Sequence, residues 1–238
     1  VEVHEVFLDD ALKLKEHGNQ KGQLHRINRF SEEETKSLRE LMECSHPDWE
    51  VLFHLYHDRK MNPMSFLKSE QFLNILTESC LEKYPYIAFA DAFHTMRSML
   101  LPVLYLLGSE VPLADTYHAI STGYGGLLAC LGGYVYRRPV LLTEHGIYTR
   151  EREEEIIRAK WVIPSFKKQW ISFFYMLSDI IYTRAFLVSA LFTNAMHAQI
   201  QMGCDKGKCR VVENGINYER LSPIPLKKED GWVDIGAI

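Results

Sequence analysis

Several features that mark common classes of protein are missing from this 238-residue sequence. Its five cysteines include no CxxC pair, so the sequence indicates neither a disulfide framework nor a zinc site and favours a reducing cytoplasm. It has no block of Lys and Arg, and its formal charge is −4, which argues against a nucleic-acid partner. Acidic residues near the amino end do not match the basic region of a signal peptide. We therefore expect a cytoplasmic protein.

Metal-binding patterns are almost as scarce. Cys204 and Cys209 bracket a short loop and could bind a metal, but no second pair follows, and two free thiols are the simpler interpretation. His54 and His57 are spaced i, i+3 on an expected helix, where a half-buried face is a simpler interpretation than a metal pair. We expect no metal.

The segment 170–192 is the one apolar stretch long enough to test as membrane-spanning. Asp179 and Arg184 lie in its middle, and a charged residue at the centre of a membrane helix costs about 2.5–3.5 kcal/mol. A buried helix followed by a buried strand fits better. The alternative of a membrane-bound structural subunit depends on this stretch alone.

The composition, with 47% hydrophobic residues and 24% charged residues, is typical of a globular domain with a large core. The length suits one α/β domain and not a complete two-domain enzyme. The first residue, Val1, and the apolar run 233–238 both give the impression of cut ends. Prolines and charges in 222–231 indicate a linker. We therefore assign 1–222 to one Rossmann-like domain, truncated at its start, and 223–238 to a hinge and the first strand of another domain.

The first hundred residues have helical patterns. The segment Ser31–Glu34 is a capping signature, further helical spacing covers 65–82 and 87–107, and a turn of helix opens after Pro47. Beyond Pro112 the pattern changes to short apolar segments separated by helix-length stretches, which predicts parallel strands joined by right-handed crossovers, with helices on both faces. The expected strands are 116–120, 140–143, 186–191 and 210–212.

Polar residues follow three of these strands, at the edge where ligands collect in parallel sheets. After the first strand, His118 leads into the glycine-rich segment 121–126, whose backbone could approach an anion at a helix amino end. The segment has neither a Walker lysine nor GxGxxG spacing, so a tight turn is the stronger interpretation of this loop alone.

The second cluster holds Glu144, His145, Tyr148, Arg150 and Arg152. The arginines could hold a phosphate or an acidic sugar, although acidic residues nearby also complement a helix amino end. His145, between a strand and a glycine turn, could bond a sugar hydroxyl, and this interpretation outweighs core packing. The third cluster is the segment 213–217.

Three motifs, 114–126, 142–152 and 211–217, together resemble glycosyltransferase family 4, and within it most closely the Pel exopolysaccharide subgroup. The resemblance covers essentially the whole chain. It implies a GT-B architecture of two facing Rossmann-like domains, of which this chain would be the acceptor-side half. It also implies sugar transfer with retention from a nucleoside-diphosphate sugar, with UDP as the expected nucleotide, without a metal or other cofactor. The expected partners are the nucleotide sugar, a saccharide acceptor and a membrane-bound polysaccharide synthase complex.

The resemblance also implies roles for individual residues. Many members of this family carry a second histidine two residues after the first. This sequence has Ile120 at that position, so the role of the missing histidine is not assigned to His118. The family's opening strand and its paired-glutamate motif are expected outside this chain, and we do not expect catalysis by this segment alone. A non-catalytic nucleotide-binding or partner-binding module on the same fold is the alternative. The implied catalytic residues are His145, Glu144 and His118, and the implied substrate-binding residues are Ser121, Thr122, Gly123, Tyr124, Gly125, Gly146, Tyr148, Arg150, Arg152, Asn214 and Gly215.

Overall fold

Four parallel strands form one sheet in the computed structural model, which describes residues 2–13, 30–224 and 231–232. The order β1-β2-β3-β4 follows the chain, and each neighbouring pair is parallel. The predicted parallel sheet is therefore confirmed, and each strand end lies within one residue of the expected position. The strands are β1 (Tyr117–Ala119), β2 (Val140–Glu144), β3 (Leu187–Ala190) and β4 (Cys209–Val211).

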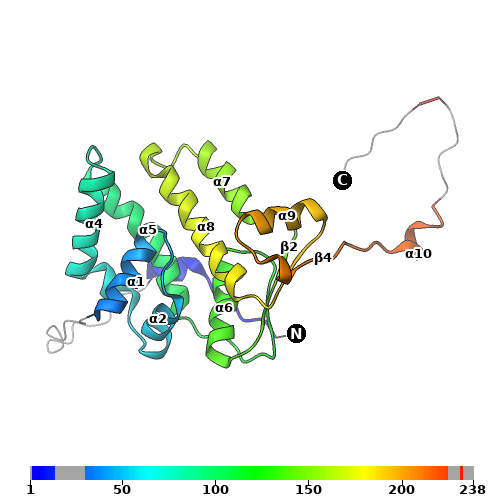
Figure 1. Cartoon of the computed structure of the whole chain (residues 1–238), viewed down its shortest axis with the longest axis horizontal. Coiled ribbons are helices and arrows are strands. Elements are labelled where there is room, and N and C mark those ends of the chain that lie inside the picture. The colour runs from blue at the N-terminus through cyan, green and yellow to red at the C-terminus, as the bar shows by residue number, and fades with distance from the viewer. Residues whose placement is uncertain (1, 14–29, 225–230, 233–238) are drawn as a thin grey trace.

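Helices fill each crossover, as expected for a Rossmann-like α/β fold (Figure 1). Side chains alternate along β2, with Val140 and Leu142 buried and Leu141 half-buried, so one face of the sheet is packed more closely than the other. The crossover helices are α6 (Tyr124–Tyr136), α7 (Tyr148–Arg158), η3 (Pro164–Phe166), α8 (Lys167–Arg184) and α9 (Thr193–Gln201).

The segment 170–192 is a helix followed by a strand, as predicted. Phe173, Leu177 and Ile181 of α8 are buried. The charges in this segment have partners outside it: Arg184 pairs with Glu50, and Asp179 lies 3.6 Å from His46. Among the described helices, none combines the length and the apolar character that crossing a membrane requires.

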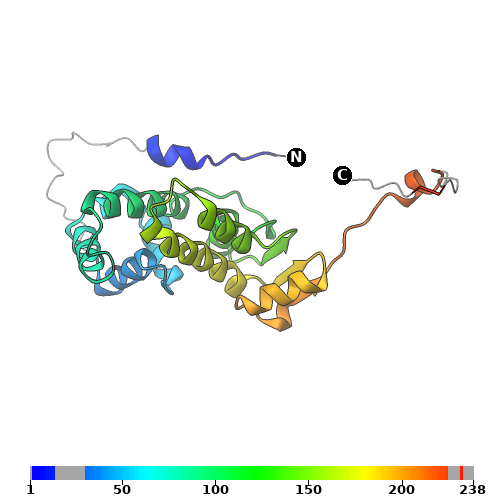
Figure 2. The ribbon, with the colours of Figure 1, turned by 90° about the horizontal axis from the view of Figure 1, so that it is seen from above.

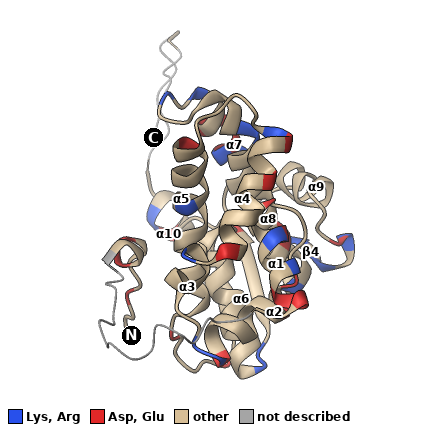
Figure 3. Ribbon diagram, turned by 90° about the vertical axis from the view of Figure 1, so that its left-hand side faces the viewer, with Lys and Arg blue, Asp and Glu red and all other residues tan. Residues whose placement is uncertain are grey.

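A helical region precedes the sheet, which confirms the expectation for the first hundred residues. The capping signature starts α1, because the Glu34 N–H donates to the Ser31 hydroxyl at 3.1 Å and the Ser31 N–H to the Glu34 carboxylate at 2.8 Å. Acidic and basic residues are interspersed over these helices (Figure 3). The elements are η1 (Leu8–Lys13), α1 (Glu32–Met42), α2 (Trp49–Phe53), the π-helix η2 (His54–Asp58), α3 (Pro63–Leu67), α4 (Glu70–Lys83) and α5 (Phe89–Leu107).

The segment after β4 leads away from the sheet and helices and carries the short helix α10 (Tyr218–Leu221) (Figure 2). Most of the segment 223–238, in which a hinge and a further strand are expected, lies outside the described residues. The assignment of 223–238 to a hinge stays a prediction.

Candidate functional site

The loops that follow β1 and β2 meet at the carboxyl edge of the sheet. Gly123, in the loop after β1, has φ of 75° and lies against the Tyr148 ring at the start of α7. A Cβ at this position would sit 2.6 Å from the Tyr148 Cε1 atom, so the close approach of the two loops requires glycine. The two motifs singled out in the sequence are therefore packed together, as parallel strands predict.

A chain of hydrogen bonds crosses three strands at this edge. The His118 Nε2 atom lies 2.8 Å from the Thr143 hydroxyl, which lies 2.7 Å from the Ser189 hydroxyl. His118 is exposed, whereas Ser189 is buried. The imidazole is thus held at the surface by a polar row that reaches from β1 to β3. Thr143 belongs to the second motif but was not among the implied site residues, and Ser189, inside the expected strand 186–191, was not singled out from the sequence.

His145 lies two residues beyond Thr143 and is exposed. Its imidazole makes no hydrogen bond or ion pair with any described residue, so it is available to a ligand at this edge. Gly146 follows it, and a Cβ there would overlap the Glu151 carboxylate. The Glu151 side chain can move aside and Gly146 has no positive φ, so this turn does not require glycine.

The motif implied a catalytic Glu144 that meets the substrate, but its carboxylate lies inside the protein. Only 1% of its surface is exposed, and its Oε2 atom accepts hydrogen bonds from the Tyr182 hydroxyl at 2.7 Å and the Gln199 amide at 3.0 Å. Burial raises the pKa of Glu144, and the two hydrogen bonds oppose this shift only in part. In this arrangement, a ligand at the open edge would meet the His145 side chain rather than the Glu144 carboxylate.

The loop after β1 is anchored from below by buried hydroxyls. The Ser178 hydroxyl of α8 donates to Thr122 at 2.8 Å and lies 2.6 Å from the Thr149 hydroxyl of α7. Thr122 is buried, so it holds the loop in place instead of offering a group at the surface. Ser121 is half-buried and Gly125 exposed.

Aromatic and basic side chains line the start of α6 and α7. The Tyr124 ring lies 6.2 Å from the Phe173 ring, and burial raises the pKa of its hydroxyl. The Arg152 guanidinium lies over the Tyr148 ring at 5.3 Å and pairs with Glu155 at 2.6 Å. Its Nε atom is buried without a hydrogen-bond partner among the described residues.

Arg150 and the third motif lie further out. Arg150 is exposed, and its guanidinium donates to the Gln201 side chain at 3.3 Å. Asn214 and Gly215 are exposed in the segment after β4, and a Cβ on Gly215 would meet no atom within 4 Å. The structure thus brings the first two motifs together and leaves the third apart.

The histidine and cysteine pairs considered for metal have other partners. His54 and His57 each lie 3.1 Å from Asp58, which also accepts a 2.6 Å hydrogen bond from Tyr134. Burial would raise the pKa of Asp58, but these hydrogen bonds lower it to about 2.

The Cys204 and Cys209 thiols are both reduced and lie 3.4 Å apart. Within the described ranges, no group of three or more His, Cys, Asp or Glu residues could hold a metal ion.

Comparison with known proteins gives one finding. Residues 1–207 match the model of a family described as "Domain of unknown function (DUF3492)". No curated protein and no solved structure gives a significant match to the chain. Because the family model covers most of the sequence, the chain belongs to the DUF3492 family.

Proposed function

We propose that the chain is the acceptor-side half of a retaining glycosyltransferase of family 4. The enzyme would transfer a sugar from a nucleoside-diphosphate sugar, with UDP as the expected nucleotide, to a growing exopolysaccharide. The observation that carries the proposal is the carboxyl edge of the sheet, where two exposed imidazoles, His118 and His145, stand beside the packed loops of the first two motifs. DUF3492 domains are usually found in glycosyltransferase-like proteins, which supports the same assignment.

The chemistry available at this edge suits a sugar and a diphosphate. Gly123, which precedes α6, makes no side-chain cap, so the first N–H groups of this helix are left for an anion, whereas the Tyr148 N–H at the start of α7 bonds the Glu144 carboxylate. Negative charge that develops on a leaving diphosphate would be stabilised by these N–H groups and by nearby arginines. Imidazoles can bond sugar hydroxyls as donors or acceptors.

The proposal also includes a second domain and partners that this chain would not supply. The sugar nucleotide would be held mainly by a second Rossmann-like domain facing this one, and the reaction would need no metal. The saccharide acceptor and a membrane-bound synthase complex are the proposed partners. Glu144, being buried, would act as a positioning residue that holds the turn between β2 and α7.

A non-catalytic binding module is the second candidate. One observation favours it: Glu144 is the sole carboxylate among the residues that the family resemblance implies, and it is buried. Among the residues that the resemblance implies, the exposed edge then offers imidazoles and arginines for binding but no carboxylate that could act as a general base.

Sugar transfer by the polypeptide that carries this chain distinguishes the two candidates. We expect label from a UDP-sugar to enter a saccharide acceptor, and we expect His145→Ala to reduce this transfer. The control is His94→Ala, which removes an exposed histidine of α5 in the helical region. Binding of the sugar nucleotide without any transfer would reject the enzyme and leave the binding module.

A further inference from the structure

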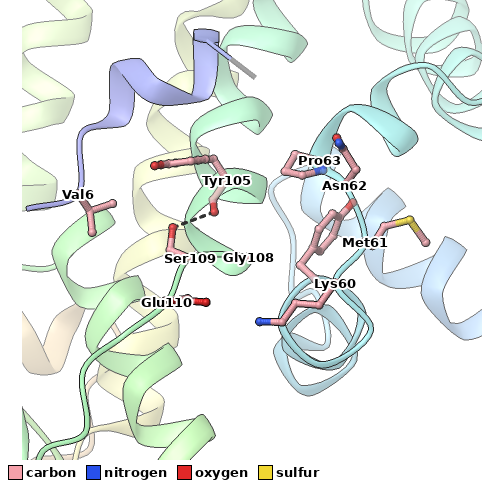
Figure 4. Close-up of a pocket in the computed structure, with 10 residues that line it drawn as sticks. Val6, Lys60, Met61, Asn62, Pro63, Tyr105, Gly108, Ser109 and Glu110 are labelled. Carbon is pink, nitrogen blue, oxygen red and sulfur yellow. Dashed lines mark hydrogen bonds between the residues drawn. The ribbon is translucent and has the colours of Figure 1, made fainter. Parts of the chain in front are cut away.

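A cavity lies in the helical region and plays no part in the proposed function. It has a volume of 360 Å³ and opens between the carboxyl end of α5 and the turn that joins η2 to α3 (Figure 4). Cavities of this size accommodate small molecules, and most are lined by apolar groups with a few polar groups that fix orientation.

The chain at one wall departs from regular structure at two adjacent places. The element η2 is a π-helix, a rare form that occurs often at functional sites. Two residues later, Lys60 has φ of 51°, a conformation that favours glycine. The N–H of Met61 bonds the Leu55 carbonyl at 3.2 Å and closes this turn. A lysine thus occupies a strained position and extends toward the cavity.

The two walls of the cavity carry opposite polarity. One wall carries Lys60 and Asn62, whose side chains lie apart from each other (Figure 4), and the Asn62 side-chain oxygen caps α3 at 2.8 Å. On the other wall, Glu110 follows the carboxyl end of α5, where the helix dipole is negative. Lys60 and Glu110 extend toward the opening from opposite sides (Figure 4) and make no hydrogen bond or ion pair with described residues.

Between these walls the lining is largely apolar. Val6, Met61 and Pro63 contribute aliphatic surface. Tyr56, on the π-helix, is fully buried and also lines the cavity, and its hydroxyl has no hydrogen-bond partner among described residues. A buried hydroxyl without a partner is costly, and a polar group that entered the cavity could relieve that cost.

We propose that this cavity binds a free α-amino acid with an apolar side chain. The ligand carboxylate would meet Lys60, its ammonium would meet Glu110 and the end of α5, and its side chain would pack on the aliphatic surface. A zwitterion satisfies both walls, whereas a ligand with one charge leaves the opposite wall unpaired.

The test uses L-leucine, L-methionine and L-phenylalanine as probes, with calorimetry and thermal melting of the whole chain as readouts. We expect at least one amino acid to bind and raise the melting temperature, and its N-acetyl and amide derivatives to bind about tenfold more weakly or worse. Failure of all three probes to bind, or equal binding of the singly charged derivatives, would overturn the proposal.

Two variants separate binding from folding. Lys60→Gly relieves the strained backbone, so it should raise the melting temperature without ligand while weakening amino-acid binding about tenfold or more. Arg137→Gly is the matched control, because Arg137 is also a basic residue with positive φ, 53°, and caps α6 away from the cavity. It should raise the melting temperature and leave binding unchanged. If Lys60→Gly binds as tightly as the parent chain, the assignment of this wall is wrong.

Discussion

The Tyr182 hydroxyl donates a 2.7 Å hydrogen bond to the Glu144 carboxylate inside the protein, at the end of the strand that leads to His145. This contact ties β2 to α8 directly beneath the candidate site. It also means that the charge of Glu144 bears on the stability of the fold.

Stability should therefore depend on pH through Glu144. Its folded-state pKa is raised by burial, whereas the unfolded chain has the ordinary value of about 4.3. The stabilising contribution is full below the unfolded pKa and is lost as pH rises through the folded pKa. Glu144→Gln keeps an oxygen for Tyr182 and cannot titrate. The melting temperature of this variant, minus that of the parent chain, should increase between about pH 4 and about pH 8. A difference that stays constant with pH would contradict this account of Glu144.

The contact between Gly123 and Tyr148 predicts a sharp contrast between neighbouring glycines. Gly123→Ala combines a positive φ with a clash against the Tyr148 ring, so it should lower the free energy of unfolding by about 2 kcal/mol or more. Gly125→Ala is the control, because a Cβ there would meet only Ser121 Oγ at 3.8 Å within the first turn of α6. That change should be neutral or stabilising by up to about 1 kcal/mol. Chemical denaturation measures both, and equal effects would show that the loops are not packed as described.

Nucleotide-sugar binding by these 238 residues should be weak if the donor is held mainly by another domain. Binding energy follows the contacts that are made, and this chain would supply few of them. Isothermal calorimetry with uridine- and adenosine-diphosphate sugars should show dissociation constants well above the micromolar range, and no transfer should be detected with the chain alone. Micromolar binding would place the donor site on this domain instead.

Most of the fold follows from local sequence patterns, because each strand is a short apolar segment between helix-length stretches. The burial of Glu144 does not follow from these patterns, because a polar residue at the end of a strand indicates a site residue until its distant hydrogen-bond partners are known. Those partners, Tyr182 and Gln199, come from α8 and α9. The strained turn at Lys60 was also not predicted, because lysine gives no local signal for a positive φ.

The hydrogen-bond row at the sheet edge illustrates the same limit. Pairing of Thr143 with Ser189 depends on the register of β2 and β3, which the structure supplies and the sequence pattern leaves open. The convergence of the first two motifs could be predicted because parallel strands end at one edge, but which side chains reach the surface there could not.

The proposed glycosyltransferase site is tested most directly by His145→Ala in the polypeptide that carries this chain, with melting temperature and sugar-transfer turnover measured on the same preparation. His145 is exposed and has no partner among described residues, so the change should alter stability by no more than about 0.5 kcal/mol. If its imidazole bonds the reacting sugar more strongly in the transition state, turnover should fall about tenfold to a hundredfold, the loss expected for one such contact. A variant that melts earlier but keeps near-normal turnover would contradict the account and remove His145 from the site.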